Sequence, residues 1–168
     1  MTSSIAVVDT VDLGHLRRCV ALAQAAVDAG DFPFGSVLVS AAGEVLAEER
    51  NREISDGDPT RHPEFALARW AATHLSEAGR AAATVYTSGE HCPMCSAAHA
   101  WVGLGRIVYA TSAEQTAAWY ADLGAGRSPV RALPVTLVAP GIAVDGPAPE
   151  LAEPMFALHR RFRTGQAN

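Results

Sequence analysis

Two short motifs combine residue types that bind metal ions, His62-Pro63-Glu64 and Cys92-Pro93-Met94-Cys95. A proline suits the first turn of a helix, so both motifs are expected at helix N-termini. The spacing of the two cysteines places both sulfurs on one side of a first turn, where free backbone N–H groups and the helix dipole favour thiolates. With His62 they form a set of three protein ligands, which leaves the fourth tetrahedral position of Zn²⁺ open for water, as in catalytic zinc sites.

Glu64 follows His62 by two residues and is expected to project over that water rather than to bind the metal. A carboxylate in this position can take a proton from the water and deliver it to a substrate. Each motif is weak when taken alone, because a C-x-x-C pair also occurs in redox proteins and as half of a zinc ribbon. A non-catalytic zinc-binding module therefore stays open as an alternative. The third cysteine, Cys19, lies beside Val20 in a helical pattern and is expected to be a core residue.

The composition indicates one acidic globular domain. The chain has 168 residues, 49% of them hydrophobic, and a net charge of −5, and we expect a single domain over residues 1–168. All 13 basic residues are arginines, and the acidic balance argues against binding to nucleic acid through many phosphates. We expect no membrane contact, because no apolar run has membrane-spanning length and the N-terminus MTSSIAVVDT lacks the basic region of a leader. The cysteines are too few for a secreted disulfide framework, which favours a cytoplasmic protein.

Hydrophobic periodicity and turn residues predict alternating helices and strands. Helices are expected over residues 9–28, 63–75, 113–123 and 150–162, and between Pro93 and Gly103. Strands are expected over 34–40, 45–51, 84–88, 106–111 and 134–138, with a loop over 52–61. The first two strands form a hairpin and are therefore antiparallel, whereas strands separated by helices favour parallel pairing. This order predicts an α/β fold, a three-layer α-β-α sandwich around a mixed five-stranded central sheet.

The segments TRHPEFALARWAA and VYTSGEHCPMCSAAHAWVGLGRIVYAT resemble the zinc-dependent cytidine deaminase-like superfamily. Its signature is H-x-E followed by P-C-x-x-C, in which zinc activates water and the glutamate is the general acid and base. The resemblance covers about residues 15–125. Within the superfamily it is strongest to the branch of guanine, guanosine, cytosine and tRNA adenosine deaminases, whose upstream strand pair is similar to FPFGSVLVS followed by Asn51.

The resemblance implies roles for the residues of the two motifs and of the upstream strand pair. His62, Cys92 and Cys95 would bind zinc, Glu64 would shuttle protons, and Asn51 would hydrogen-bond the substrate ring.

Three further residues are candidates for substrate binding. Phe34 would either stack on the ring or belong to the core. Glu114 lies where guanine deaminase-like members carry an acidic substrate contact, but it is equally suited to the first turn of a helix. His91 replaces the proline that the family usually has before the first cysteine, and we expect it at the rim of the site as a substrate contact. It is disfavoured as a substitute ligand, because the side chains of adjacent residues diverge.

The implied reaction is the hydrolytic deamination of a free nucleobase or nucleoside, with release of ammonia. A guanine-type ring is preferred, and cytosine or an aminated triazine stays open. A tRNA-editing deaminase is the second alternative, but the densest basic cluster, Arg160, Arg161 and Arg163, is better explained as a solvated helix end. The resemblance also implies a homodimer, with residues 130–168 as a candidate lid or dimer segment.

Overall fold

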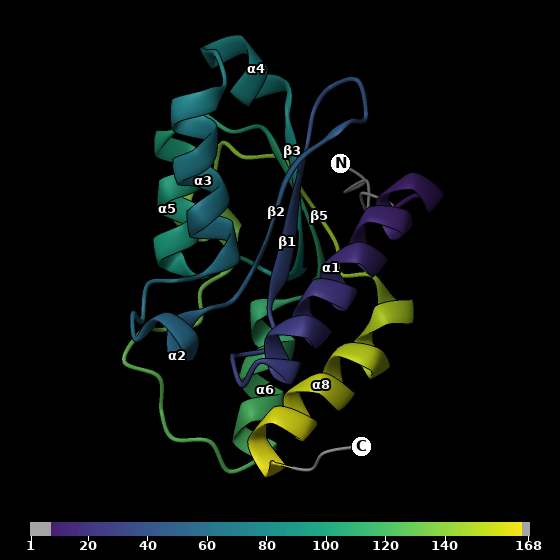
Figure 1. Cartoon of the computed structure of the whole chain (residues 1–168), viewed down its shortest axis with the longest axis vertical. Coiled ribbons are helices and arrows are strands. Elements are labelled where there is room, and N and C mark those ends of the chain that lie inside the picture. Colours follow the sequence, from purple (N-terminus) through teal and green to yellow (C-terminus); the bar gives the residue numbers. More distant parts are fainter. Residues whose placement is uncertain (1–7, 166–168) are drawn as a thin grey trace, which may run out of the picture.

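A five-stranded mixed sheet in the order β2-β1-β3-β4-β5 forms the middle of the molecule (Figure 1). The strands are β1 (Gly35–Val39), β2 (Val45–Arg50), β3 (Thr84–Gly89), β4 (Arg106–Thr111) and β5 (Val144–Asp145). β1 pairs antiparallel with both β2 and β3, whereas β3, β4 and β5 are parallel to one another. The predicted hairpin and the mixed sheet are therefore confirmed.

This computed structural model describes residues 8–165. Residues 1–7, from which we inferred the lack of a leader, and residues 166–168, which the predicted domain includes, lie outside the described part of the chain. Between residues 8 and 165, no helix is both long and apolar enough to cross a membrane.

Helices cover both faces of the sheet (Figure 1). α1 (Thr10–Asp28) and α8 (Ala152–Thr164) lie side by side on one face, and α6 (Ala113–Asp122) contacts α8. α3 (Pro63–His74) and α5 (Pro93–Trp101) pack together on the opposite face. The predicted three-layer α/β architecture is confirmed, and so are the helices that the prolines were expected to begin.

The strand β1 shows why the core forms two layers. All of its residues are buried, because both faces of the sheet carry helices. Val37 belongs to the cluster that packs against α1, whereas the next residue, Leu38, packs with Leu67 of α3. This alternation follows from the period of two residues in a strand. At Gly35 a Cβ atom would lie only 2.6 Å from the backbone oxygen of Cys19, so α1 can cross β1 closely only because this residue has no side chain.

The strand predicted over residues 134–138 is wrong. Val135–Val138 form a single helical turn, α7, and the fifth strand is β5, which pairs with β4 through Ile107 and Val108. The β-branched residues of PVTLV favour a strand locally. In the structure, however, the backbone N–H of Val135 donates to Glu90 Oε1 at 2.9 Å, and its side chain is buried against Ile107.

Two short helical segments were not predicted, α2 (Glu53–Asp56) and α4 (Glu77–Ala82), whereas η1 (Pro149–Leu151) overlaps the start of the helix predicted over 150–162. α2 lies inside the predicted loop over 52–61. The buried carboxylate of Asp31 stabilises it by accepting hydrogen bonds from the backbone N–H groups of Ile54 and Ser55 at 3.0 and 2.8 Å. Because Asp31 is 23 residues away from Ile54 in the sequence, no local pattern could have predicted α2.

A network around Asp12 ties the start of α1 to the parallel strands. Arg106 of β4 donates to both carboxylate oxygens of Asp12 at 2.8 Å, and the Tyr86 hydroxyl of β3 donates to Oδ1 at 2.9 Å. Arg106 also donates to Asp145 of β5. Burial alone raises the pKa of Asp12, but the bonds from Arg106, the Asp9 backbone and Tyr86 outweigh it and lower the pKa.

We expect Asp12→Ala to lower the free energy of unfolding by about 2–3 kcal/mol, because it leaves the Tyr86 hydroxyl and two of the three Arg106 nitrogens without their acceptor. The loss should shrink as the pH falls through the lowered pKa of Asp12, where the native carboxylate is itself protonated. Urea unfolding as a function of pH measures both effects. Glu48→Ala is the control, because its pair with Arg18 is largely exposed and should contribute less than about 1 kcal/mol. Equal losses in the two variants would contradict the prediction.

Candidate metal centre and active site

The N-termini of two helices carry the metal-binding motifs. His62 is the N-cap residue of α3 and Cys92 that of α5, and both have extended backbones, with ψ of 140° and 168°. Pro63 and Pro93 follow as the first helical residues. Because α3 and α5 pack against each other, these helix starts can share one site.

The side chains of His62, Cys92 and Cys95 form one compact group. Their ligand atoms lie within 4.8 Å of one another, and His62 Nδ1 is 3.6 Å from the Sγ atom of each cysteine. Zinc–ligand distances of about 2.0–2.3 Å in a tetrahedral site place ligand atoms about 3.5–3.8 Å apart. The spacing, the two soft sulfurs and the imidazole therefore fit Zn²⁺. Three protein donors leave one tetrahedral position for water.

Hydrogen bonds within the group set the charge of its members. The hydrogen bond with Cys95 lowers the pKa of Cys92 to about 4 against the effect of burial, and the bond with His62 adds to this lowering. Burial lowers the pKa of His62, but hydrogen bonds with Cys92 and Glu53 outweigh it and raise the pKa to about 10. The hydrogen bond to Cys92, with burial, raises the pKa of Cys95. Since metal ligands must be deprotonated, a bound zinc ion would displace one proton from the His62 ring and the thiol proton of Cys95.

The carboxylate of Glu64 lies beside these three donors. Glu64 is 6% exposed, and its Oε2 atom is 3.7 Å from Cys95 Sγ. Its other oxygen, Oε1, accepts a hydrogen bond from the Thr87 hydroxyl of β3 at 2.7 Å. Burial raises the pKa of Glu64, although His62 and Thr87 act in the opposite direction. One oxygen is thus held by the sheet while the other faces the candidate ligands.

Asn51 and Phe34 lie together at the open end of the hairpin, since Phe34 precedes β1 and Asn51 follows β2. The backbone N–H of Asn51 donates to the Phe34 carbonyl at 2.9 Å, and the side chain of Asn51 is fully buried. The Phe34 ring lies next to Gly89 at the end of β3 and meets the His159 ring of α8 edge-on at 5.3 Å. The structure therefore places Phe34 between the sheet and α8, half-buried, where stacking on a substrate stays a prediction.

His91 lies in the interior and not at the rim, where we expected it. It is 1% exposed, and its ring meets His99 edge-on at 5.3 Å. Neither ring nitrogen has a hydrogen-bond partner within residues 8–165, and burial lowers the pKa of His91 far below its usual range. The ring turns inward because it packs against His99 of α5.

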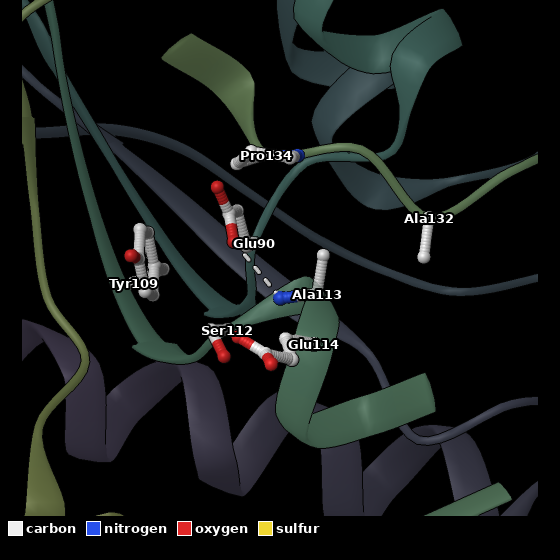
Figure 2. A pocket seen from close by; sticks show the side chains of 7 residues that line it. All are labelled: Glu90, Tyr109, Ser112, Ala113, Glu114, Ala132 and Pro134. Atoms are coloured by element: carbon white, nitrogen blue, oxygen red, sulfur yellow. Dashed lines mark hydrogen bonds between the residues drawn. The ribbon is translucent and has the colours of Figure 1, made fainter. Parts of the chain in front are cut away.

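Glu114 is in the first turn of α6, and Figure 2 shows it on the wall of a pocket. This pocket is also lined by Glu90, Tyr109, Ser112, Ala113, Ala132 and Pro134. Glu90 accepts hydrogen bonds from the backbone N–H groups of Ala113 and Val135, both at 2.9 Å, and so holds the ends of β3, α6 and α7 together. Among the described residues, the lining does not include the three candidate ligands, so a substrate contact by Glu114 stays a prediction.

Two residues of this site were missed from the sequence, Thr87 and Glu53. Thr87 holds Glu64 and also accepts a hydrogen bond from Ser36 Oγ at 2.9 Å. Glu53 Oε1 lies 3.2 Å from His62 Nε2. A threonine near the end of a predicted strand does not by itself indicate a role at the site. Glu53 lies in the segment over residues 52–61, which was predicted to be a loop. Cys19, by contrast, is fully buried in α1 as expected, and burial raises the pKa of its thiol.

Comparison with known proteins identifies the family. The model of the "cytidine and deoxycytidylate deaminase zinc-binding region" matches residues 10–111, which include both motifs. A probable cytosine deaminase of Schizosaccharomyces pombe is 35% identical over 103 residues, which are 61% of this chain and 62% of the relative. A tRNA-specific adenosine deaminase of Haemophilus influenzae is 32% identical over 103 residues, 61% of this chain and 60% of the relative.

A guanine deaminase of Bacillus subtilis is 39% identical over 96 residues, which are 56% of this chain and 61% of the relative. The X-ray structure of guanine deaminase from Bacillus subtilis is similar with a TM-score of 0.56 and 30% identity, over 73% of this chain and 82% of that one. In the sequence alignments the chain spans less than two thirds of each relative's own length. The matched region holds the complete His-Cys-Cys group, so this chain belongs to the cytidine and deoxycytidylate deaminase zinc-binding family, and zinc is its metal.

Proposed function

We propose that this protein is a zinc-dependent hydrolase that deaminates a free nucleobase or nucleoside and releases ammonia. The observation that carries the proposal is the buried Glu64 carboxylate, 3.7 Å from Cys95 Sγ, beside a group of three metal donors. A zinc module with a purely structural role needs four ligands and has no use for a buried carboxylate at its metal. His62, Cys92 and Cys95 are the proposed ligands.

Zinc, when bound, lowers the pKa of water to about 7 and stabilises negative charge that develops in the reaction. Glu64 is the proposed carrier of protons. Its Oε2 accepts one proton from the attacking water and delivers it to the ring nitrogen. It then accepts the remaining proton of the hydroxyl that has been added to the ring carbon and delivers it to the amino group, so that the C–N bond breaks, ammonia leaves and the carbon becomes a carbonyl. Thr87 keeps Oε1 engaged, so the carboxylate cannot rotate away from the reacting side. Asn51 orients the ring, and Phe34 offers it an aromatic surface.

A guanine-type ring is the preferred substrate. The support is the 39% identity to a guanine deaminase across the region that carries the motifs. A small substrate also fits the electrostatics, because the chain carries a net charge of −5 and two arginines of the C-terminal cluster are engaged. Arg161 pairs with Asp28 at 2.5 Å, and Arg163 lies 4.3 Å from the centroid of the Tyr120 ring. Cytosine and aminated triazines are the other rings to test.

We further propose a cytoplasmic homodimer. None of the three cysteines forms a disulfide bond, which suits a reducing compartment. The support for a dimer is the exposure of large apolar side chains on two helices that contact each other: Trp101 of α5 is 88% exposed and Leu137 of α7 is 70% exposed.

We expect Cys92→Ser to lose bound zinc and part of the stability, because ligand loss removes folding free energy as well as chemistry. Zinc content by mass spectrometry and thermal unfolding measure the two effects. Cys19→Ser is the matched control, since it makes the same chemical change at a buried cysteine outside the group and should retain zinc. Unchanged zinc content in Cys92→Ser would overturn the ligand assignment.

We expect Glu64→Gln to retain zinc and to lower kcat by about 10²- to 10⁴-fold, because the amide cannot carry protons. Ammonia release is measured with guanine, guanosine, cytosine, adenine and an aminated triazine. The proposal predicts activity of the unaltered protein on at least one of these rings, with guanine or guanosine first.

Two results would favour the alternatives. Tight, salt-dependent binding of tRNA with no reaction on free rings would favour the tRNA-editing deaminase. A zinc-loaded protein that releases ammonia from none of these substrates and binds no tRNA would support the non-catalytic zinc module.

We expect Trp101→Glu to shift the protein from dimer to monomer, because it places a charge in the proposed apolar interface. Light scattering at several protein concentrations measures the mass. Val11→Glu is the control, since Val11 is 64% exposed and belongs to α1, which lies on the face of the sheet opposite to α5. A dimer mass in both the unaltered protein and Trp101→Glu would show that the interface lies elsewhere. A monomer mass in the unaltered protein would contradict the proposed dimer.

A further inference from the structure

One carboxylate oxygen connects two parts of the site that have separate roles. Glu53 Oε1 accepts a hydrogen bond from Asn51 Nδ2 at 2.7 Å and lies 3.2 Å from His62 Nε2. The backbone N–H of Glu53 donates to Asn51 Oδ1 at 3.0 Å. The side chains of Glu53 and His62 are 20% and 27% exposed, so both are largely shielded from water.

Backbone hydrogen bonds hold the segment over residues 51–62, which includes α2 and Glu53, in this position. The N–H of Arg52 donates to the Arg61 carbonyl at 3.1 Å, and the N–H of Asp58 donates to the Glu53 carbonyl at 3.0 Å. These bonds close the segment between Asn51 and His62 and bring its two ends together. The position of Glu53 is therefore built into the loop.

Asp31 anchors the same loop to the body of the protein. Its fully buried carboxylate accepts from the N–H groups of Ile54 and Ser55 and from the Ser55 hydroxyl. Arg50 of β2 donates to it at 2.7 Å and also to the Asn51 carbonyl at 2.8 Å. The two residues after Glu53 and the residue before Asn51 thus share one buried acceptor.

The contact with Glu53 decides which nitrogen of His62 meets the metal. A carboxylate can only accept, so Nε2 of His62 is the donor in this pair. The neutral ring then presents the lone pair of Nδ1, the nitrogen that lies 3.6 Å from both cysteine sulfurs. A carboxylate behind a metal-binding histidine also raises the basicity of that ligand.

The same residue fixes the amide of Asn51. An asparagine side chain has two N–H donors and one oxygen with two lone pairs. Glu53 takes one donor and one lone pair, which sets the orientation of the amide and leaves one donor and one acceptor for another molecule. Such a pair matches the adjacent donor and acceptor groups on the edge of an amino-substituted ring.

We propose that Glu53 is a positioning residue that orients His62 toward the metal and Asn51 toward the substrate, so that metal and substrate binding share one support. The part that concerns substrate rests on the proposed function. The part that concerns zinc rests on the geometry of the His62 group alone.

The test uses the full chain and three variants, with zinc affinity measured by chelator competition and the absorption spectrum of Co²⁺ in place of zinc. Glu53→Ala should weaken zinc binding about 10- to 100-fold and alter the Co²⁺ spectrum. Glu53→Gln, which keeps an acceptor without the charge, should show a smaller loss. Glu49→Gln is the matched control, because Glu49 is a neighbouring carboxylate whose partner is Arg52, and it should bind zinc as the unaltered protein does.

A double variant separates positioning from general damage. Glu53→Ala should raise KM about three- to tenfold, as expected for one lost hydrogen bond. In Asn51→Ala, the further change Glu53→Ala should leave KM unchanged, because Glu53 acts on substrate through Asn51, yet it should still weaken zinc binding.

Zinc affinity of folded Glu53→Ala within about twofold of the Glu49→Gln control would overturn the role toward His62. Additive effects on KM would overturn the role toward Asn51. If Glu53→Ala does not fold, Glu53→Gln provides the same comparison. A protein that deaminates none of the rings contradicts the proposed function, whereas zinc affinity and the Co²⁺ spectrum still decide the role of Glu53.

Discussion

The pairing of β1 with its two neighbours is the constraint on which the candidate site depends. Gly35 lies opposite Arg50 of β2, and Ser36 lies opposite Thr87 of β3. The start of β1, the end of β2 and the end of β3 therefore lie at the same end of the sheet. This brings together Phe34, Asn51 and the segment after Gly89, which are far apart in sequence. Side chains alternate along a strand, so a shift of one residue would turn Thr87 away from Glu64 and move every buried residue of β1 to the wrong face.

The site is also a place where buried polar groups find partners. Isolated carboxylates are costly to bury, and each one near the site has a donor: Thr87 for Glu64, Asn51 for Glu53, and Arg50 for Asp31. These bonds hold the acidic side chains in defined orientations, as the proposed transfer of protons by Glu64 requires. Hydrogen-bonded acidic side chains thus surround the group of metal donors.

Local patterns in the sequence predicted the regular elements well. The capping residue Asp9 and the apolar face of residues 9–28 depend on neighbours within a turn or two, and α1 was predicted almost to its ends. The failures are short segments governed by distant groups. Residues 134–138 form α7 because Val135 meets Glu90, and α2 forms where Asp31 supplies an acceptor. Neither partner can be found by periodicity.

The sequence by itself determined the chemistry that is available: two cysteines, a histidine and a glutamate, each at the start of a helix that a proline begins. Their types and their local spacing depend on only a few adjacent residues. Only the tertiary structure decided how the site is completed. It placed Glu53 behind His62, Thr87 behind Glu64, and His91 in the interior beside His99. Those contacts join residues from different strands, loops and helices, so they exist only once the sheet has its register and the helices have packed onto it.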